Sequence, residues 1–308
     1  MRKKILVVGS LNMDMVVRVK SMPLPGETVY GGGLTYLPGG KGANQAAAVA
    51  KLGGDTAMIG CVGDDAFGAK LSNELKAMNV DESGISRVIG VTTGLAVIYV
   101  DDGGGNSIVV VPGANHTCDT ARIQLHEDMI AHCDYVLLQM EIPQSTVYNT
   151  IRLAKTMGKT VILNPAPAPT FIPEDILRLV DYLTPNEHEA VTLAGGDAAM
   201  RPEEAACILN GKGAGKVVVT LGGKGALLSA DGTCTYFPAR EVRAVDTTAA
   251  GDCFNGAFAV ALSEGMDEAR AIAFANRAAS IAVTRAGTQN SMPAREEVDE
   301  ISEIWNEK

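Results

Sequence analysis

Short apolar runs alternate with helical patterns along most of the chain. The apolar runs predict buried strands at residues 5–8, 57–62, 135–140, 161–163, 182–183 and 217–221. The segments between them predict helices at residues 43–52, 67–78, 146–157, 173–179, 187–194 and 203–209. Continuous apolar strands separated by helices are typical of a parallel sheet that is covered on both faces. The pattern therefore predicts an α/β fold, with a doubly wound, mostly parallel sheet flanked by helices.

Two segments, residues 15–36 and 95–111, interrupt this alternation. The first holds short β-rich pieces between prolines and glycines. The second holds two apolar runs around a polar, glycine-rich turn at 101–106, which predicts a β-hairpin. Because neither has room for a crossover helix, we expect one domain over residues 1–308, with these segments forming a small β-sheet lid at the carboxyl edge of the main sheet. The lid strands lack clean alternation, which indicates that both faces are covered, one by ligand and the other by a second subunit in a homodimer.

Length, composition and charge fit a folded soluble protein. At about 150 residues per domain, 308 residues allow about two domains or one large domain with an addition. The content of 46% hydrophobic and 20% charged residues lies in the globular range. The formal net charge of −10 repels nucleic acid and anionic membranes, so an anionic ligand needs a local binding device.

The chain carries no pattern for export, membrane insertion or a cysteine framework. The apolar run at 5–8 is shorter than the roughly seven to fifteen residues of a signal peptide, and no run approaches the roughly eighteen of a membrane span. We therefore expect a cytoplasmic protein. The six cysteines form no C-x-x-C pair and only four histidines accompany them, so we expect neither a zinc site nor a disulfide framework.

Polar residues follow several of the predicted strands, where open α/β sheets bind their ligands. They lie at residues 9–14, 139–141, 164–167, 184–187 and 220–223. The familiar nucleotide motifs are not among them. Leu153 replaces the first glycine of a P-loop that would end at 158–160, and no G-x-G-x-x-G follows the first strand.

Residues 245–258 form the strongest local string, a run of small residues that leads into a helix. Small residues leave the amides of a helix start unobstructed, and those amides with the helix dipole form an anion hole. Asp252 lies where a base could meet a hydroxyl beside that anion. The alternative is that Asp252 only caps the helix.

A second glycine cluster occupies residues 38–46 and precedes an alanine-rich helix. Its glycines let the backbone and Asn44 approach a ligand closely. Taken alone, such a string is more often a β-to-α connection, and Lys41 is a solvated lysine.

Together the two strings resemble the signature motifs of the ribokinase-like family of carbohydrate kinases, residues 39–46 the first and 246–256 the second. The resemblance covers essentially the whole chain and implies ATP-dependent phosphoryl transfer to a sugar. Residues 9–14 are more similar to family members that act on ribose than to those that act on fructose or adenosine. The resemblance therefore implies phosphorylation of D-ribose at its 5-hydroxyl, giving D-ribose 5-phosphate and ADP.

Carried over position by position, the resemblance implies a base, a sugar site and a nucleotide site. Asp252 accepts the proton, while the amides of Ala250 and Gly251 hold the charge on the transferred phosphoryl group. The sugar contacts are Asn12, Asp14, Gly40, Lys41, Asn44, Glu141 and Asp252. The ATP contacts are Asn186, Thr220, Gly222, Gly223, Gly225, Gly251 and Asn276. Two of these have plainer alternatives, since Glu141 suits a solvated strand end and residues 220–225 suit an ordinary hairpin.

The resemblance also implies Mg²⁺ and K⁺ as cofactors beside ATP. Glu189 lies three residues after Asn186, hence on one face of a helix start, where it would hold a water-coordinated Mg²⁺. The same pair suits a capping box, which can coexist with that role. The residues expected around K⁺ are Asp246, Thr248, Ala282, Arg285, Gly287 and Ser291. Asp246 alone suits a simple turn cap.

Two positions depart from the family pattern. Cys253 stands where a threonine is usual and is expected to face the anion hole, and Asn276 stands where a histidine is frequent, which weakens adenine stacking. The histidines are not needed by this chemistry: His188 lies in the nucleotide element without a clear role, and the remaining three are expected at the surface or at helix ends, namely His116, His126 and His132.

Two alternatives to a ribose kinase stay open. The first is a related kinase for 2-deoxyribose, fructose or adenosine. The second is a non-catalytic sugar or nucleotide sensor, which has no need of a base at an anion hole.

Overall fold

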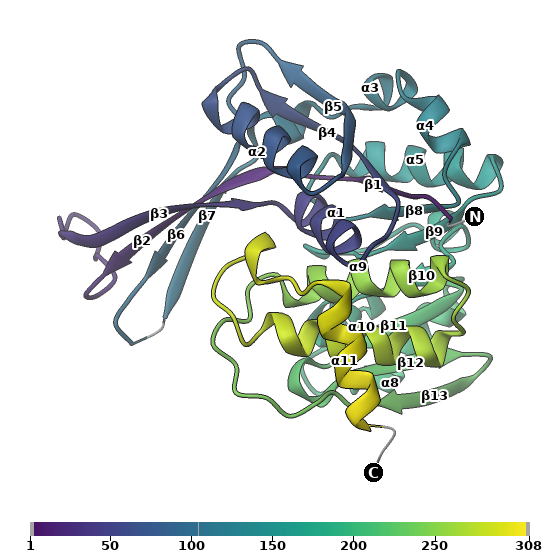
Figure 1. The fold of residues 1–308 in the computed structure, drawn as a ribbon. Helices are drawn as coiled ribbons and strands as arrows, with labels where there is room; N and C mark the ends of the chain where they lie inside the picture. The colour runs from purple at the N-terminus through teal and green to yellow at the C-terminus, as the bar shows by residue number, and fades with distance from the viewer. Residues whose placement is uncertain (1–2, 104, 306–308) are drawn as a thin grey trace.

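The computed structural model describes residues 3–103 and 105–305. In this part of the chain the main sheet has nine strands, in the order β13-β12-β11-β10-β9-β8-β1-β4-β5 (Figure 1). The strands are β1 (Ile5–Val8), β4 (Thr56–Gly63), β5 (Asp81–Val88), β8 (Tyr135–Leu138), β9 (Thr160–Leu163), β10 (Tyr182–Leu183), β11 (Lys216–Thr220), β12 (Ala226–Ala230) and β13 (Thr233–Phe237). Neighbours from β5 to β11 are parallel, whereas β12 and β13 continue the sheet antiparallel.

Helices cover both faces of this sheet. One core cluster packs against α1 (Lys41–Lys51), α2 (Ala66–Ala77), α9 (Ala250–Ser263), α10 (Glu268–Ala282) and α11 (Arg295–Trp305). The opposite cluster packs against α3 (Thr120–Gln124), α4 (Glu127–Ala131), α5 (Gln144–Thr156), α6 (Glu174–Leu177), α7 (Glu187–Ala194) and α8 (Pro202–Gly211). Short 3₁₀ turns are η1 (Gly113–Thr117), η2 (Gly222–Lys224) and η3 (Gln289–Ser291).

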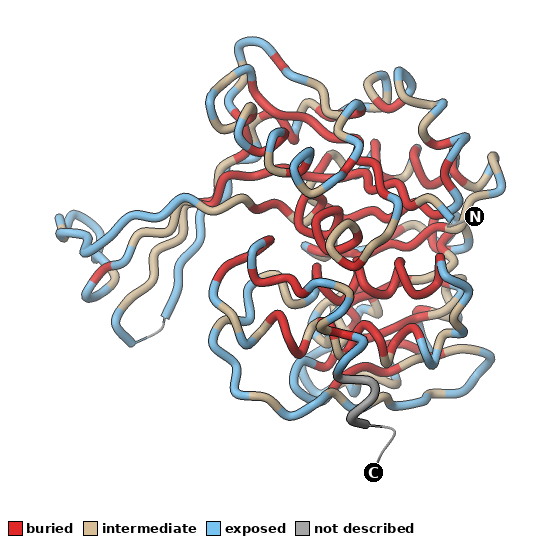
Figure 2. The backbone as a smooth tube through the Cα atoms, viewed as in Figure 1, coloured by how far each residue is buried: buried red, intermediate tan, exposed pale blue. Residues whose placement is uncertain are grey.

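Strand β1 shows why the sequence reads as continuous apolar runs. Ile5 and Val7 join one core cluster, and Leu6 and Val8 join the other. Because successive side chains of a strand point to opposite faces, a strand between two helical layers must be apolar at every position. The tube in Figure 2 is accordingly buried through the centre of the sheet. The predicted doubly wound, mostly parallel architecture is confirmed, and each predicted strand and helix is present with small shifts at its ends.

The sequence analysis did not predict β5, β12, β13, α3, α4, α10 or α11. Strand β5 carries the polar sequence DESGISRV and lies at one edge of the sheet, so only part of it is buried. Strand β13 forms the other edge and is likewise half exposed. Edge strands with one partner lack the apolar run by which the central strands were found.

A separate four-stranded sheet forms the lid, in the order β3-β2-β6-β7. Its strands are β2 (Asn12–Val19), β3 (Gly31–Gly39), β6 (Gly94–Val100) and β7 (Asn106–Val111). The sheet is mixed, because β2 and β6 are parallel whereas the other pairs, including the expected β6–β7 hairpin, are antiparallel. Figure 1 shows it projecting from the body of the molecule, with β2 following β1 and β3 leading into α1.

Within the single chain, strand β7 of the lid is uncovered, and the expected cover by ligand and a second subunit stays a prediction. Residues 108–111 of β7 are apolar, and each is at least 45% exposed. Since neighbours in a strand point to opposite faces, both sides of β7 are open to solvent.

Among the described residues, no helix is sufficiently long and apolar to cross a bilayer.

Candidate active site

Two adjoining cavities lie where several strands of the main sheet end. The larger is about 610 Å³ and the smaller about 220 Å³. They share five lining residues, from the ends of β10 and β11 and from the start of α9: Asn186, Thr220, Thr247, Ala250 and Gly251. The first turn of α9 therefore lies at the junction of the cavities.

Helix α9 begins without a side-chain cap. Its N-cap residue is Ala249, which adopts a left-handed conformation with φ 58°, and its carbonyl accepts the Cys253 N–H at 2.9 Å. The first amides of a helix have no partner within the helix, and the helix dipole favours negative charge beside them. Gly251, the second residue of the helix, is exposed at the cavity junction. The Ala250 N–H donates to the Thr247 carbonyl at 3.3 Å. The role of this helix start as an anion hole stays a prediction.

Asp252 does not cap α9, so the capping alternative is wrong. It is the third residue of the helix, and its carboxylate binds side chains of α1 instead. Asn44 Nδ2 donates to Oδ2 at 2.9 Å, and Gln45 Nε2 donates to Oδ1 at 3.0 Å. The carboxylate is only 6% exposed, yet it lines the smaller cavity beside Gly251.

Further charged groups surround this carboxylate. Burial, reinforced by the negative charges of Glu141 and Asp252, raises the pKa of Asp14 to about 7. Burial lowers the pKa of Lys41, but the charges of Asp252, Glu141 and Glu189 outweigh it and hold that pKa above its usual value. Lys41 therefore lies among carboxylates in the smaller cavity rather than in solvent.

The remaining sugar-side residues predicted from the sequence are held by specific contacts. Glu141 is not a free solvated carboxylate, since it accepts the Ser10 hydroxyl at 2.6 Å and the Lys41 N–H at 3.0 Å. Asn12 is buried, and its Oδ1 accepts Asn115 Nδ2 at 2.7 Å. A Cβ at Gly40, where φ is 88°, would lie 2.7 Å from the Asn12 nitrogen, so this position requires glycine.

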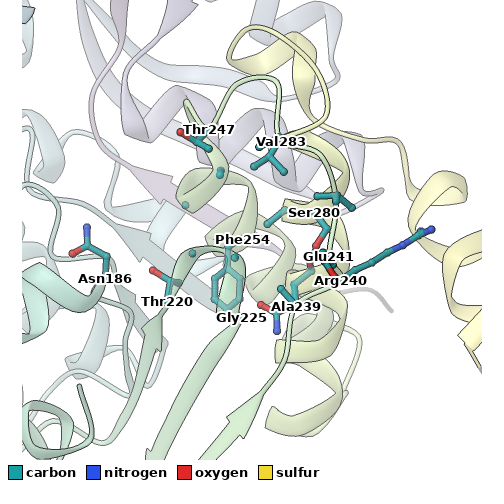
Figure 3. Close-up of a pocket in the computed structure, with 18 of the residues that line it drawn as sticks. Asn186, Thr220, Gly225, Ala239, Arg240, Glu241, Thr247, Phe254, Ser280 and Val283 are labelled. Atoms are coloured by element: carbon teal, nitrogen blue, oxygen red, sulfur yellow. Dashed lines mark hydrogen bonds between the residues drawn. The ribbon is translucent and has the colours of Figure 1, made fainter. Parts of the chain in front are cut away.

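The predicted ATP contacts all line the larger cavity: Asn186, Thr220, Gly222, Gly223, Gly225, Gly251 and Asn276. Phe254, Ala279 and Val283 give the cavity apolar surface, and Figure 3 shows Phe254 between Thr220 and Ser280. The sequence analysis assigned no role to these residues, because their apolar side chains do not differ from those of the core. Asn276 Nδ2 donates to the Phe237 carbonyl at 3.0 Å, which ties its amide to the end of β13.

Glu189 forms the capping box that was one of the two interpretations made from the sequence, and its role toward Mg²⁺ stays a prediction. Its carboxylate accepts the Asn186 N–H at 2.9 Å, and the Asn186 side chain accepts the Glu189 N–H at 2.8 Å, which forms a capping box at α7. Burial raises the pKa of Glu189 in spite of that hydrogen bond. Glu189 also lines the smaller cavity.

The predicted K⁺ residues meet in part. Asp246 Oδ1 accepts the Thr248 N–H at 2.9 Å, as in a turn cap, and Oδ2 accepts the Gly287 N–H at 3.0 Å. Burial raises the pKa of Asp246, but these hydrogen bonds outweigh it and hold the pKa below its usual value. Ala282 O accepts the Arg285 N–H at 3.1 Å, which closes the end of α10. Ser291 donates its hydroxyl to the Thr288 carbonyl at 2.7 Å. Asp246 thus joins Thr248 to the 287 loop. In contrast, Ala282 O, Arg285 N–H and the Ser291 hydroxyl bond locally, and the Arg285 side chain pairs with Glu297.

Cys253 does not face the anion hole, contrary to expectation. It follows Asp252 by one helical position, which turns its side chain to another face of α9 and into the apolar core. Burial, with the charge of Asp252, raises the pKa of its thiol to about 12.

As expected, two histidines are exposed and a third is at the start of α4, namely His116, His132 and His126. His188 lines the larger cavity.

A buried polar network links Asp252 to the ends of two strands. Gln45 Nε2 donates to Asn164 Oδ1 at 3.1 Å, and Asn164 Nδ2 donates to the Thr184 carbonyl at 2.9 Å. Thr184 bonds Asn255, whose amide donates to the Gly251 carbonyl at 2.8 Å. The sequence analysis singled out residues 164–167 and 184–187 as polar strand ends but gave Asn164 and Thr184 no role. The signal in the sequence was that Asn164 and Thr184 each directly follow a predicted strand.

The chain matches the pfkB family carbohydrate kinase profile over residues 2–295, and it belongs to this family. It is 41% identical to the ribokinase of Haemophilus influenzae, over 98% of this chain and 99% of that protein. Two solved structures are similar to it over 98% of its length. One is a ribokinase from Thermotoga maritima, with TM-score 0.90, 40% identity and 100% of that chain covered. The other is Arabidopsis thaliana ribokinase complexed with ribose and ATP, with TM-score 0.91, 35% identity and 99% covered.

The raised pKa of Asp14 predicts a pH-dependent stability. In the folded protein the Asp14 carboxyl has a pKa of about 7, against a usual value of 3.8. Its contribution to the stability of the fold is therefore complete below pH 3.8 and is lost as the pH rises through about 7. Each pH unit between them costs up to about 1.4 kcal/mol. Asp14→Asn cannot ionise at this position. We therefore expect the stability of Asp14→Asn, relative to that of the unmodified protein, to increase from pH 4 to pH 7. Thermal unfolding of both across that range measures the difference, and a constant or shrinking difference contradicts the prediction.

Proposed function

We propose that the protein phosphorylates D-ribose at its 5-hydroxyl with ATP, giving D-ribose 5-phosphate and ADP. The observation that carries this proposal is the placement of the Asp252 carboxylate beside the uncapped first turn of α9, at the junction of two cavities. The larger cavity suits a nucleotide and the smaller one a sugar hydroxyl with the transferred phosphoryl group. The ribokinases to which the chain is similar support the choice of ribose.

In this mechanism Asp252 accepts the proton of the 5-hydroxyl as the oxygen attacks the γ-phosphorus of ATP. The Ala250 and Gly251 amides hold the charge that develops on the transferred group, and ADP leaves into the larger cavity. Phosphoryl transfer needs little covalent chemistry from the protein, so positioning and electrostatics account for most of the rate. Asp252 is already held by two amides before substrate arrives, which meets the need for position.

The sugar is recognised by the polar groups that line the base of the lid. Asn12 and Asp14 come from β2, and Lys41 and Asn44 come from the start of α1. Asn44 Oδ1 is buried without a partner, so it is available to a sugar hydroxyl. A site built to bond a hydroxyl rejects an analogue without it, because its own buried groups are then unpaired.

Two cations complete the proposal. Glu189 would hold Mg²⁺ through water in the smaller cavity, where the metal neutralises phosphate charge. Asp246 and Thr248, with carbonyls and hydroxyls of the loop from Ala282 to Ser291, would hold K⁺ beside the turn that precedes α9. We place this chemistry in the cytoplasm, where ATP is supplied.

The substrate assignment predicts that D-ribose gives the highest kcat/KM in a panel with 2-deoxyribose, fructose and adenosine.

The same assignment predicts that Asp14→Ala raises KM for ribose far more than KM for ATP, because the substitution leaves buried sugar-side groups unpaired. A coupled assay of ADP release measures both. Fructose or adenosine exceeding ribose tenfold overturns the assignment, and absence of ADP release with every sugar supports a non-catalytic sensor.

The catalytic assignment predicts that Asp252→Asn lowers kcat by about 10²–10⁴, because the amide cannot accept the proton. The matched control is Asp267→Asn. Asp267 caps α10 by accepting the Arg270 N–H at 2.8 Å, and asparagine caps equally well. The control should therefore turn over normally. If Asp252→Asn melts lower but retains its activity, Asp252 has a structural role alone.

The cation assignment predicts activation by K⁺ without direct contact to substrate. A large, weakly hydrated cation at Asp246 would fix the turn that carries the Ala250 and Gly251 amides, and so preorganise the anion hole. Na⁺ should activate less, and Asp246→Ala should lower activity and abolish the K⁺ response. Initial rates in K⁺ and in choline chloride at equal ionic strength test this. Equal rates in the two salts indicate that Asp246 only caps its turn.

We further propose that residues 1–308 act as one domain and that its lid, about residues 15–36 and 95–111, pairs with its copy in a symmetric homodimer. The apolar residues 108–111 are exposed, and an open apolar sheet otherwise aggregates. Light scattering should report a dimer at micromolar concentration. Replacement of Ile108 and Val110 by lysine should give a monomer, and a monomeric unmodified protein refutes the proposal.

A further inference from the structure

The Asp252 carboxylate is held by a side chain for which the reaction itself has no use. Asn44 reaches one oxygen and belongs to the proposed sugar site. Gln45 reaches the other oxygen at 3.0 Å and is fully buried, so it has no access to substrate. Its contact with the base needs another explanation.

The Gln45 amide has one allowed orientation. Gln139 Nε2 donates to Gln45 Oε1 at 2.7 Å, which fixes that atom as the acceptor. The Gln45 nitrogen must then face Asp252 Oδ1 and Asn164 Oδ1, the latter at 3.1 Å. A flipped amide would present its oxygen to two acceptors and its nitrogen to a donor, and would lose all three bonds.

Gln139 is itself fixed by the ends of the central strands. It follows β8, is fully buried, and packs so closely on the end of β1 that a Cβ at Gly9 would lie 2.0 Å from its Oε1. That Oε1 has no hydrogen-bond partner among the described residues, so packing holds the side chain in place. Asn164, which follows β9, is tied to the Thr184 carbonyl after β10. The orientation of Gln45 is thus set by residues that directly follow the central strands.

We propose that Gln45, oriented by Gln139, is a positioning residue that fixes the plane of the Asp252 carboxylate. An amide suits this task because it donates hydrogen bonds without adding charge. The inference rests on the proposed role of Asp252 as the base. In this chain of hydrogen bonds, Gln139 orients Gln45, and Gln45 orients the carboxylate of Asp252.

The titratable groups that interact with Asp252 come from four elements. Lys41 lies on α1, Asp14 on β2 and Glu189 on α7, and Cys253 follows on α9 itself. None of them replaces a lost hydrogen bond from Gln45, because its donor atom is in contact with Oδ1. Removal of that donor therefore destabilises the ionised carboxylate directly.

The first test is Gln45→Met, which keeps the size of the side chain but cannot donate. We expect kcat to fall about ten- to a hundredfold, as when a reacting group is slightly misplaced, with KM for ribose and ATP within about threefold. The acid limb of the pH profile of kcat/KM should move to higher pH. Gln45→Glu, which keeps the acceptor for Gln139 and adds a like charge, should move it further.

The second test uses the serial order of the two glutamines. Gln139→Met should reduce kcat, and adding it to Gln45→Met should cause little further loss, since Gln139 acts only through Gln45. Ser229→Ala is the matched control. It removes a buried hydrogen bond, from Ser229 to Asn210 Oδ1 at 2.7 Å, on a strand outside the site, and should retain kcat and the pH profile.

An unchanged kcat and pH profile in Gln45→Met overturns the inference. So does a loss that is uniform across pH, or one in which the two glutamine variants add independently, since either indicates a purely structural role. These outcomes presuppose an active unmodified protein. If that protein releases no ADP with any sugar, the proposed function fails instead.

Discussion

The close approach of α1 to two other pieces of backbone is the constraint on which the site depends. A Cβ at Gly42 would lie 2.6 Å from the Ser10 nitrogen, and one at Gly256 of α9 would lie 2.5 Å from the Ala48 Cβ. Real side chains do not fit at such distances, so glycine is required at both contacts. Through them α1 brings its own Asn44 and Gln45 to Asp252 of α9, and lies against the turn that leads to the sugar-side strand β2.

Electrostatics imposes a second constraint, because the site of an enzyme that binds ATP is itself acidic. The chain has a net charge of −10, and Asp14, Glu141, Glu189 and Asp252 gather around a single lysine. In the proposed mechanism, attraction for the phosphates would come from backbone amides and the dipole of α9, together with cations, and not from the overall field. Helix starts supply positive potential without a side chain, which leaves the carboxylates free for proton transfer and hydroxyl binding.

The lid and the body share the sugar-side residues. Asn12 and Asp14 begin β2, which continues outward into the lid, while their own side chains are buried at its base. Asn115 secures this base, because its side chain bonds both the N–H and the carbonyl of Leu11, at 2.9 and 3.0 Å. The lid is therefore anchored at the residues proposed to contact the sugar, while the outer strand β7 is exposed.

The sequence alone determined the architecture and most of the candidate site. Buried parallel strands must be apolar at each position, so the central strands could be located, and the two glycine-rich strings located the starts of α1 and α9. The polar edge strand β5 lacked that pattern, since an edge needs no second helical layer. Tertiary structure alone decided which atoms meet. The strings that hold Gln45 and Asp252 are 207 residues apart, and only the packing of α1 on α9 shows that Asp252 binds amides of α1 rather than its own helix end. The same packing turns Cys253 into the core, because one helical step of about 100° separates a side chain in the cavity from one in the interior.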